Sequence, residues 1–200
     1  MTMTDVEIRP VFESRTKCLK AATHTVHEKL DAGIMAHEPF SSRARYSVFL
    51  KVQYAFHRDI DALFSDPILA KLLPDLDRRR RLDLIAQDLV DLGNELPAMK
   101  TEPIFVDGKD LPRALGWLYV AEGSNLGAAF LLKAAAAIGL SEIFGARHLS
   151  AAPEGRGLHW RTFTAALDEV PLSDEQERVA IAGAEAAFQR VRELVREFFD

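Results

Sequence analysis

The segment GWLYVAEGSNLGAAFLLK, residues 116–133, decides the fold, because it has the pattern of one long helix interrupted by two glycines. Apolar runs at 111–122 and 126–138 extend it on both sides. A glycine inside a helix costs about 1 kcal/mol relative to alanine, so Gly123 and Gly127 together cost about 2 kcal/mol. Residues four apart share a helix face, so the pair leaves a strip of bare backbone and favours a kink there.

This bare strip has two explanations. Another helix could pack closely against it, as small residues allow. Alternatively, a flat ligand could lie directly against the helix backbone, where a side chain would be in the way. The strip by itself does not separate these explanations.

A second notable pattern is KAATHTVHEKLD, residues 20–31, on a predicted first helix. Lys20 and His27 are seven residues apart, which places them nearly in line and about 10 Å apart along the axis. A histidine at the edge of an apolar face is often structural. It could also ligate a planar metal cofactor whose carboxylate edge the lysine reaches.

Helical periodicity dominates the rest of the chain, and alternating patterns are almost absent. We predict helices over about 12–32, 43–64, 76–92, 158–167 and 173–199, a short helix after Pro67, and a long loop over 94–112. No repeat or second domain is visible. Residues 1–200 are therefore expected to form one all-α domain, a compact helical bundle.

Composition argues against several classes of partner. The formal net charge of −5 disfavours nucleic acid, and the basic cluster at 78–81 is interpreted as a solvated helix start. The weakly polar stretch 126–140 is too short to span a bilayer, so no membrane partner is expected. The single cysteine, Cys18, permits a reducing compartment, and the acidic N-terminus is unlike a secretory leader. We expect a cytoplasmic protein.

Common catalytic motifs are missing from the sequence. It contains no HExxH, GxSxG, Walker A or CxxC. No glutamate stands three residues before any histidine, so the Glu-x-x-His pattern of di-iron bundles is absent too. The six histidines are His24, His27, His37, His57, His148 and His159.

Four segments together resemble the haem oxygenase family, in particular its bacterial members. They are LKAATHTVHEKLD (19–31), RARYSVFLKVQYAFHRDIDALF (43–64), GWLYVAEGSNLGAAFLLK (116–133) and GLSEIFGARHL (139–149). The resemblance covers about residues 19–188. It implies a helical bundle that holds haem between the first helix and a glycine-kinked distal helix.

The resemblance implies roles for several residues. His27 matches the proximal iron ligand, and Gly123 and Gly127 match the distal glycines. The implied reaction is oxidation of haem by dioxygen and supplied electrons to biliverdin, ferrous iron and carbon monoxide, with haem as both cofactor and substrate. The protein would contribute orientation and a water network that delivers protons. The electron donor would be a protein such as a ferredoxin or a flavin reductase.

The distal waters need an anchor in this chain. Animal-type members carry an aspartate after the first distal glycine, where this sequence has Ser124. As in bacterial members, Gln53, His57 and Arg81 are the candidate anchors. Ordinary polar pairing would explain these three side chains equally well.

Two further positions bear on the product isomer. Lys20 and Tyr119 match residues near the haem propionates of bacterial members, in the arrangement associated with biliverdin IXα. Phe188 would pack against the macrocycle edge or simply in the core, and His148 is either structural or supports the site.

Two alternatives to this enzyme stay open. The same pocket could belong to a haem carrier or sensor that does not degrade haem. The architecture could also serve another small ligand, as in thiamine-salvage enzymes, because a fold does not fix a function.

Overall fold

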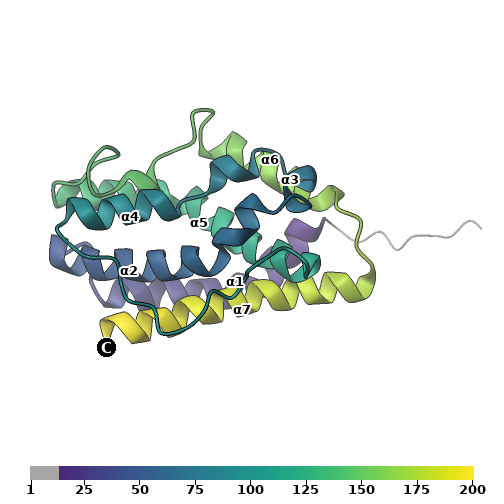
Figure 1. The fold of residues 1–200 in the computed structure, drawn as a ribbon, viewed down its shortest axis with the longest axis horizontal. Helices are drawn as coiled ribbons and strands as arrows, with labels where there is room; N and C mark the ends of the chain where they lie inside the picture. Colours follow the sequence, from purple (N-terminus) through teal and green to yellow (C-terminus); the bar gives the residue numbers. More distant parts are fainter. Residues whose placement is uncertain (1–13) are drawn as a thin grey trace, which may run out of the picture.

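The computed structural model describes residues 14–200, which form an all-helical protein, as expected. The helices are α1 (Arg15–Ala36), α2 (Arg43–Ile60), α3 (Leu69–Leu72), α4 (Leu82–Asp91), α5 (Leu111–Ala137), α6 (Arg156–Glu169) and α7 (Asp174–Phe199). Short 3-10 turns are η1 (Asp61–Ser65), η2 (Leu76–Arg79) and η3 (Arg147–Leu149). Figure 1 shows the long helices running roughly along one direction.

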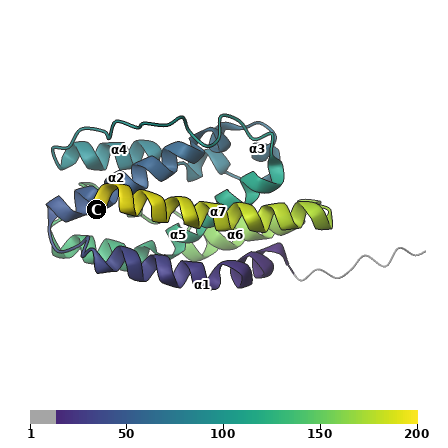
Figure 2. The ribbon, with the colours of Figure 1, turned by 90° about the horizontal axis from the view of Figure 1, so that it is seen from below.

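Helix α5 is the centre of the bundle. It packs most extensively on α7, which also lies along α1 and α2, while α6 covers another side of α5 (Figures 1 and 2). α4 packs on α2 and on the turn η3. The two helices that the sequence singles out, α1 and α5, are thus both held by the last helix of the chain.

Two glycines make the close α5–α7 contact possible. A Cβ atom on Gly116 would lie 2.6 Å from the backbone nitrogen of Ala184, and closer still to the carbonyl oxygen of Ala180. A Cβ on Gly183 would lie 2.6 Å from the carbonyl oxygen of Arg113. The backbones of the two helices are therefore in direct contact, a spacing that only glycine allows.

The apolar core has two clusters that meet between the helices. In the larger one, the ring of Trp117 stacks on that of Phe56, with 5.9 Å between centroids. The smaller one surrounds the buried ring of Tyr46. Both include the partly buried Ile34 and Phe199, so the clusters are contiguous.

Several helix boundaries agree with the sequence signals. The side chain of Ser42 accepts a hydrogen bond from the backbone of Arg45 and caps α2. Ser173 and Gln176 form a capping box at the start of α7. Gly93, with a φ of 70°, follows the end of α4.

Other boundaries differ from the predictions. The helix expected over 76–92 is divided into η2 and α4, because Arg80 is extended between them. α1 continues to Ala36 rather than ending near 32, and Phe12 lies outside the described residues. The two apolar runs around the glycines form the single, continuously hydrogen-bonded helix α5.

Candidate active site

His27 lies on α1, and its ring points toward α7. Its side chain is 54% exposed. The ring meets that of Phe188 edge-on, with 5.6 Å between centroids and 77° between planes. Its Nε2 atom is 3.5 Å from a carboxylate oxygen of Asp31, one turn further along α1. An accessible imidazole held by an apolar ring is suited to ligating a metal in a macrocycle.

The glycine strip of α5 has open space where side chains would be. Apart from its chain neighbours and the surrounding backbone of α5, no atom of the described residues lies within 4 Å of the position that a Cβ on Gly127 would take. At Gly123 the nearest atom is on the ring of Trp160, at 3.7 Å. Apolar side chains nearby are unusually accessible, with Leu126 43% and Phe130 67% exposed. Of the two explanations for the strip, helix packing does not apply at Gly127, and a flat apolar ligand fits.

His57, a predicted anchor of the distal waters, is fully enclosed on α2. Burial, with smaller contributions from His148 and Arg81 nearby, lowers its pKa from 6.5 to about 3. Its Nδ1 atom has no hydrogen-bond partner among residues 14–200. His57 is therefore neutral near pH 7, and its free nitrogen is available to another hydrogen-bonding molecule.

His148 acts as a support for this region. Its Nδ1 atom is 2.8 Å from Oδ2 of the fully buried Asp88, which also accepts a bond from the His148 backbone nitrogen. Its Nε2 atom has no hydrogen-bond partner in the part of the chain that the structure describes. Asp88 thus fixes the orientation of the His148 imidazole, which acts electrostatically on His57.

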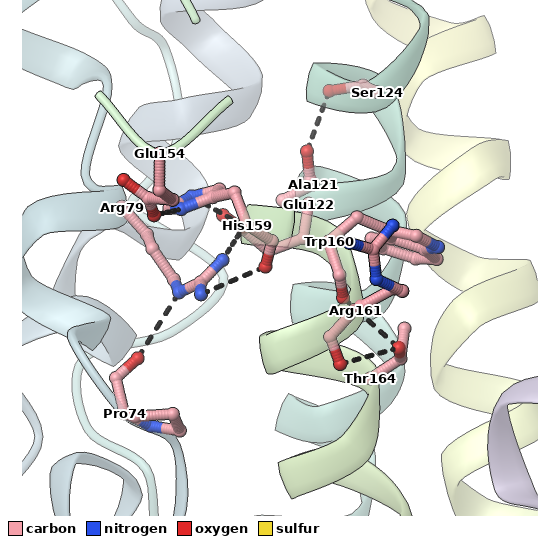
Figure 3. A network of polar contacts seen from close by, with 10 residues as sticks. All are labelled: Pro74, Arg79, Ala121, Glu122, Ser124, Glu154, His159, Trp160, Arg161 and Thr164. Atoms are coloured by element: carbon pink, nitrogen blue, oxygen red, sulfur yellow. Dashed lines mark hydrogen bonds and ion pairs between the residues drawn. The ribbon is translucent and has the colours of Figure 1, made fainter. Parts of the chain in front are cut away.

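The basic cluster at 78–81 is not a solvated helix start, and that interpretation was wrong. Arg79 and Arg81 are buried, and Nη1 of Arg79 donates to Oε2 of Glu122 at 2.6 Å (Figure 3). Arg80 pairs with Asp61. Arg79 turns inward to pair with a buried carboxylate of α5 that needs a cationic partner, whereas Arg78 stays exposed.

Sequence reasoning missed this buried network of Arg79, Glu122 and His159. His159 places Nε2 3.5 Å from Glu122 and Nδ1 2.7 Å from Glu154 (Figure 3). A glutamate within the apolar run 111–122 was the available signal, since a buried carboxylate requires partners.

The remaining predicted residues occupy different surroundings. The ring of Tyr119 is nearly buried against Trp160, with 5.6 Å between centroids, and burial raises its pKa. The Ser124 hydroxyl donates to the carbonyl oxygen of Ala121 at 2.7 Å, so it is bonded to its own helix (Figure 3). Gln53 is half-buried on α2, and Lys20 is exposed on α1.

Comparison with known proteins decides the family. A family model described as heme oxygenase matches residues 14–197. The chain belongs to the haem oxygenase family. The haem oxygenase PigA of Pseudomonas aeruginosa is 42% identical over 185 residues, which is 92% of this chain and 93% of that protein. The resemblance to bacterial haem oxygenases is confirmed.

Solved haem oxygenases share the fold. The NO- and CO-bound haem oxygenase of Neisseria meningitidis is 42% identical, with a TM-score of 0.88 over 94% of this chain and 93% of that one. The haem oxygenase of Leptospira interrogans is 17% identical, with a TM-score of 0.76 over 92% of this chain and 100% of that one. The second likeness concerns the fold alone.

As a haem oxygenase, the chain is an oxidoreductase that degrades haem with dioxygen and electrons from a reductase system. Haem is its substrate and its prosthetic group, and a histidine coordinates the iron. Among the described residues, no helix is both long enough and apolar enough to cross a membrane.

Proposed function

We propose that His27 is the iron-coordinating histidine and that the backbone at Gly123 and Gly127 forms the opposite wall of the haem site. The observation that carries this proposal is the exposed His27 ring braced edge-on by Phe188. A second support is the open space beside Gly127. Haem fits these residues, because it is flat and largely apolar and needs one imidazole from the protein.

Bound haem supplies the redox chemistry that activates dioxygen. The chain's own residues orient it and manage water and protons. A strip of bare backbone lets a small ligand lie close to α5 while the helix restricts its direction. His57, neutral because burial lowers its pKa to about 3, accepts or donates a hydrogen bond without adding charge. Gln53 and Arg81 complete the proposed anchors for distal water.

The direct test replaces the proposed ligand and a matched neighbour. His27→Ala is expected to abolish the native haem absorbance and turnover, with partial recovery on addition of imidazole. His24→Ala is the control, because His24 is exposed on the same helix and lies beside Glu28. Normal turnover by His27→Ala without added base would refute the assignment.

We further propose biliverdin IXα as the product isomer. Lys20 on α1 and Tyr119 on α5 come from the two helices that flank the proposed site, and both match family positions near the propionates. Contacts from both walls would set the rotation of haem in its plane. Chromatography of the product should show the α isomer, and Lys20→Gln should increase the β or δ isomers. A wild-type product of mainly β or δ biliverdin would contradict the proposal.

A haem carrier or sensor without turnover is the alternative use of this pocket. The open strip at Gly127 weighs against it, because storage of haem does not require bare backbone beside the ligand. Ascorbate, or a reductase with ferredoxin, is added to the haem complex in air. Decay of the Soret band into a biliverdin spectrum supports the enzyme, and a stable oxy-complex supports the carrier.

The electron donor is proposed to be a ferredoxin or a flavin reductase. Lys29 on α1 and Arg192 and Arg196 on α7 line a groove near the helices that hold His27 and Phe188. The three cations outnumber the one acidic residue that lines the groove, Asp200, so the groove suits an acidic donor. Glutamate at these three positions should slow reduction of the haem complex by ferredoxin while ascorbate-driven turnover stays unchanged. If the rates with ferredoxin and with ascorbate fell equally, the donor would not dock in this groove.

We also propose that residues 1–200 act as one domain in the cytoplasm. The contiguous apolar clusters support a single cooperative unit. One coincident unfolding transition by two probes, and recovery in the cytoplasmic fraction of cells, are the expected results.

A further inference from the structure

A small cavity lies beside the GSNLG segment, between α5, α6 and the start of α4. Its polar lining consists of Arg81, Glu122, Asn125, Arg156 and His159, and Trp160 closes part of the apolar side. The cavity leaves about 10 Å³ for the centre of a water molecule, which is room for about one water. Figure 3 shows Glu122 of α5 beside His159 of α6 and the guanidinium of Arg79.

Four of these five polar side chains have a buried atom without a hydrogen-bond partner among the described residues, whereas Arg156 donates to backbone carbonyl oxygens. The atoms are Nε of Arg81, Oε1 of Glu122, Nδ2 of Asn125 and Nε2 of His159. Buried polar atoms are rarely left without partners, because each costs about 1–3 kcal/mol. All four belong to residues around one cavity, so a single small ligand can satisfy them together.

The donor and acceptor types match a water molecule. Arg81 and Asn125 present N–H donors, and Glu122 presents a carboxylate acceptor. Nδ1 of His159 lies 2.7 Å from Oε1 of Glu154. With the ring proton on Nδ1, that nitrogen donates to Glu154 and Nε2 is an acceptor. A water can accept from both donors and donate to both acceptors.

We infer that this cavity is a buried water site and that Glu122, through this water, is a positioning residue for Arg81 and for Asn125 within the glycine strip. The second part rests on the proposed function, because it assigns Arg81 and the strip to the haem reaction. Arg81 also acts electrostatically on His57, so its placement bears on the distal side. Among the residues that line this cavity, Glu122 is the one carboxylic acid, and its side chain is buried.

The charge on Glu122 depends on its neighbours. Burial raises its pKa, while the charge and hydrogen bond of Arg79 and the charge of Arg81 oppose that rise. The charged or titratable groups around it from η2, α4 and α6 are Arg79, Arg81, Glu154, Arg156 and His159. Protonation of Glu122 would weaken its hold on the water and release Arg81.

The water site is tested by a high-resolution crystal structure of the full chain with and without hemin. One ordered water should lie within hydrogen-bond distance of the four atoms named above. The same structure of Asn125→Ala should show the water displaced or disordered. A cavity filled by a rearranged side chain, or four atoms paired among themselves, would overturn the inference.

The positioning role is tested by Glu122→Gln, with Glu185→Gln on the exposed face of α7 as the matched control. In the ferric haem complex, the pH of the optical acid–alkaline transition should fall by about half a pH unit or more in Glu122→Gln, because a nearby negative charge is lost. The pH profile of haem degradation should move the same way, and haem affinity should stay within about twofold of wild type, or about 0.4 kcal/mol.

A transition pH in Glu122→Gln equal to that of the control would overturn the positioning role. Should Glu122→Gln fail to fold, Asn125→Ala gives the second measurement, since it leaves the Glu122–Arg79 pair intact and should also shift the transition. Failure of the wild type to degrade haem would refute the proposed function instead, while the crystallographic test of the water site would still hold.

Discussion

The two halves of α5 use glycine for opposite purposes. In the first half, Gly116 faces the backbone of α7 so closely that a Cβ would lie 2.6 Å from a backbone nitrogen. In the second half, the same Cβ on Gly127 would meet nothing within 4 Å. One helix therefore has a closed half, residues 111–122, and an open half, residues 123–137.

The contrast explains how one helix both anchors the bundle and forms a ligand wall. The closed half is enclosed by α7 and the core, whereas Leu126 and Phe130 of the open half are exposed apolar side chains. Apolar exposure and absent packing at the same place mark a surface intended for a partner rather than for another helix. The glycine spacing alone did not separate these two cases.

The largest effect is expected from Gly116→Ala in the closed half. The new methyl group would overlap the backbone of α7, which has no flexible side chain to move aside, so the free energy of unfolding should fall by about 3 kcal/mol or more. Chemical denaturation of the haem-free protein measures it. A decrease in the free energy of unfolding below about 1 kcal/mol would mean that the two halves of α5 do not differ in this way.

The second prediction concerns the enclosed His57 on α2. Its pKa is about 3 in the folded state and 6.5 ordinarily, so the unfolded chain takes up a proton first as the pH falls. Its contribution to stability is complete above pH 6.5 and decreases on acidification towards pH 3, by up to about 1.4 kcal/mol per pH unit. His57→Gln should flatten this dependence between pH 4 and 6. Parallel plots of stability against pH for the wild type and His57→Gln would contradict this prediction.

Gly127→Ala in the open half should change the free energy of unfolding in the opposite direction to Gly116→Ala. Alanine favours the helix by about 1 kcal/mol and meets no neighbour, so the haem-free protein should become more stable by up to that amount. Haem degradation should nevertheless slow, because the methyl group occupies the proposed ligand side. Thermal unfolding and single-turnover rates measure the two effects. A destabilised apo-protein would mean that the open half is packed after all.

The smallest effect on folding is expected from Phe130→Gln. The side chain is largely exposed, so the stability of the haem-free protein should change by no more than about 0.5 kcal/mol. Haem affinity should decrease, since an apolar contact at the rim is replaced by an amide. Hemin titration measures it, and unchanged affinity would exclude Phe130 from the site.

Much of the fold follows from local signals in the sequence. The serine caps at Ser42 and Ser173 and the turn at Gly93 were predictable because each acts on neighbouring residues. The division of 76–92 was not, since it depends on Arg79 reaching Glu122, 43 residues away. Long-range pairing of buried charges leaves no periodic pattern.

The candidate site divides in the same way. Spacing and resemblance singled out His27 and the paired glycines, and their roles stay proposals. Phe188 was expected at the macrocycle edge or in the core, and its edge-on contact with His27 was not predicted. Glu122 and His159 were missed because each is a single polar residue whose partners come from other helices. Gly116 and Gly183 were missed for the same reason, since only the assembled α5–α7 pair shows why they lack side chains.

The contact between Phe188 and His27 also has a consequence for biosynthesis. α7 leaves the ribosome after α1, α2 and α5, and all three pack against it. A nascent chain that already carries His27 but not α7 thus lacks the ring that braces it and the helix that seats α5. The ability to bind haem should then arise only after α7 has been synthesised.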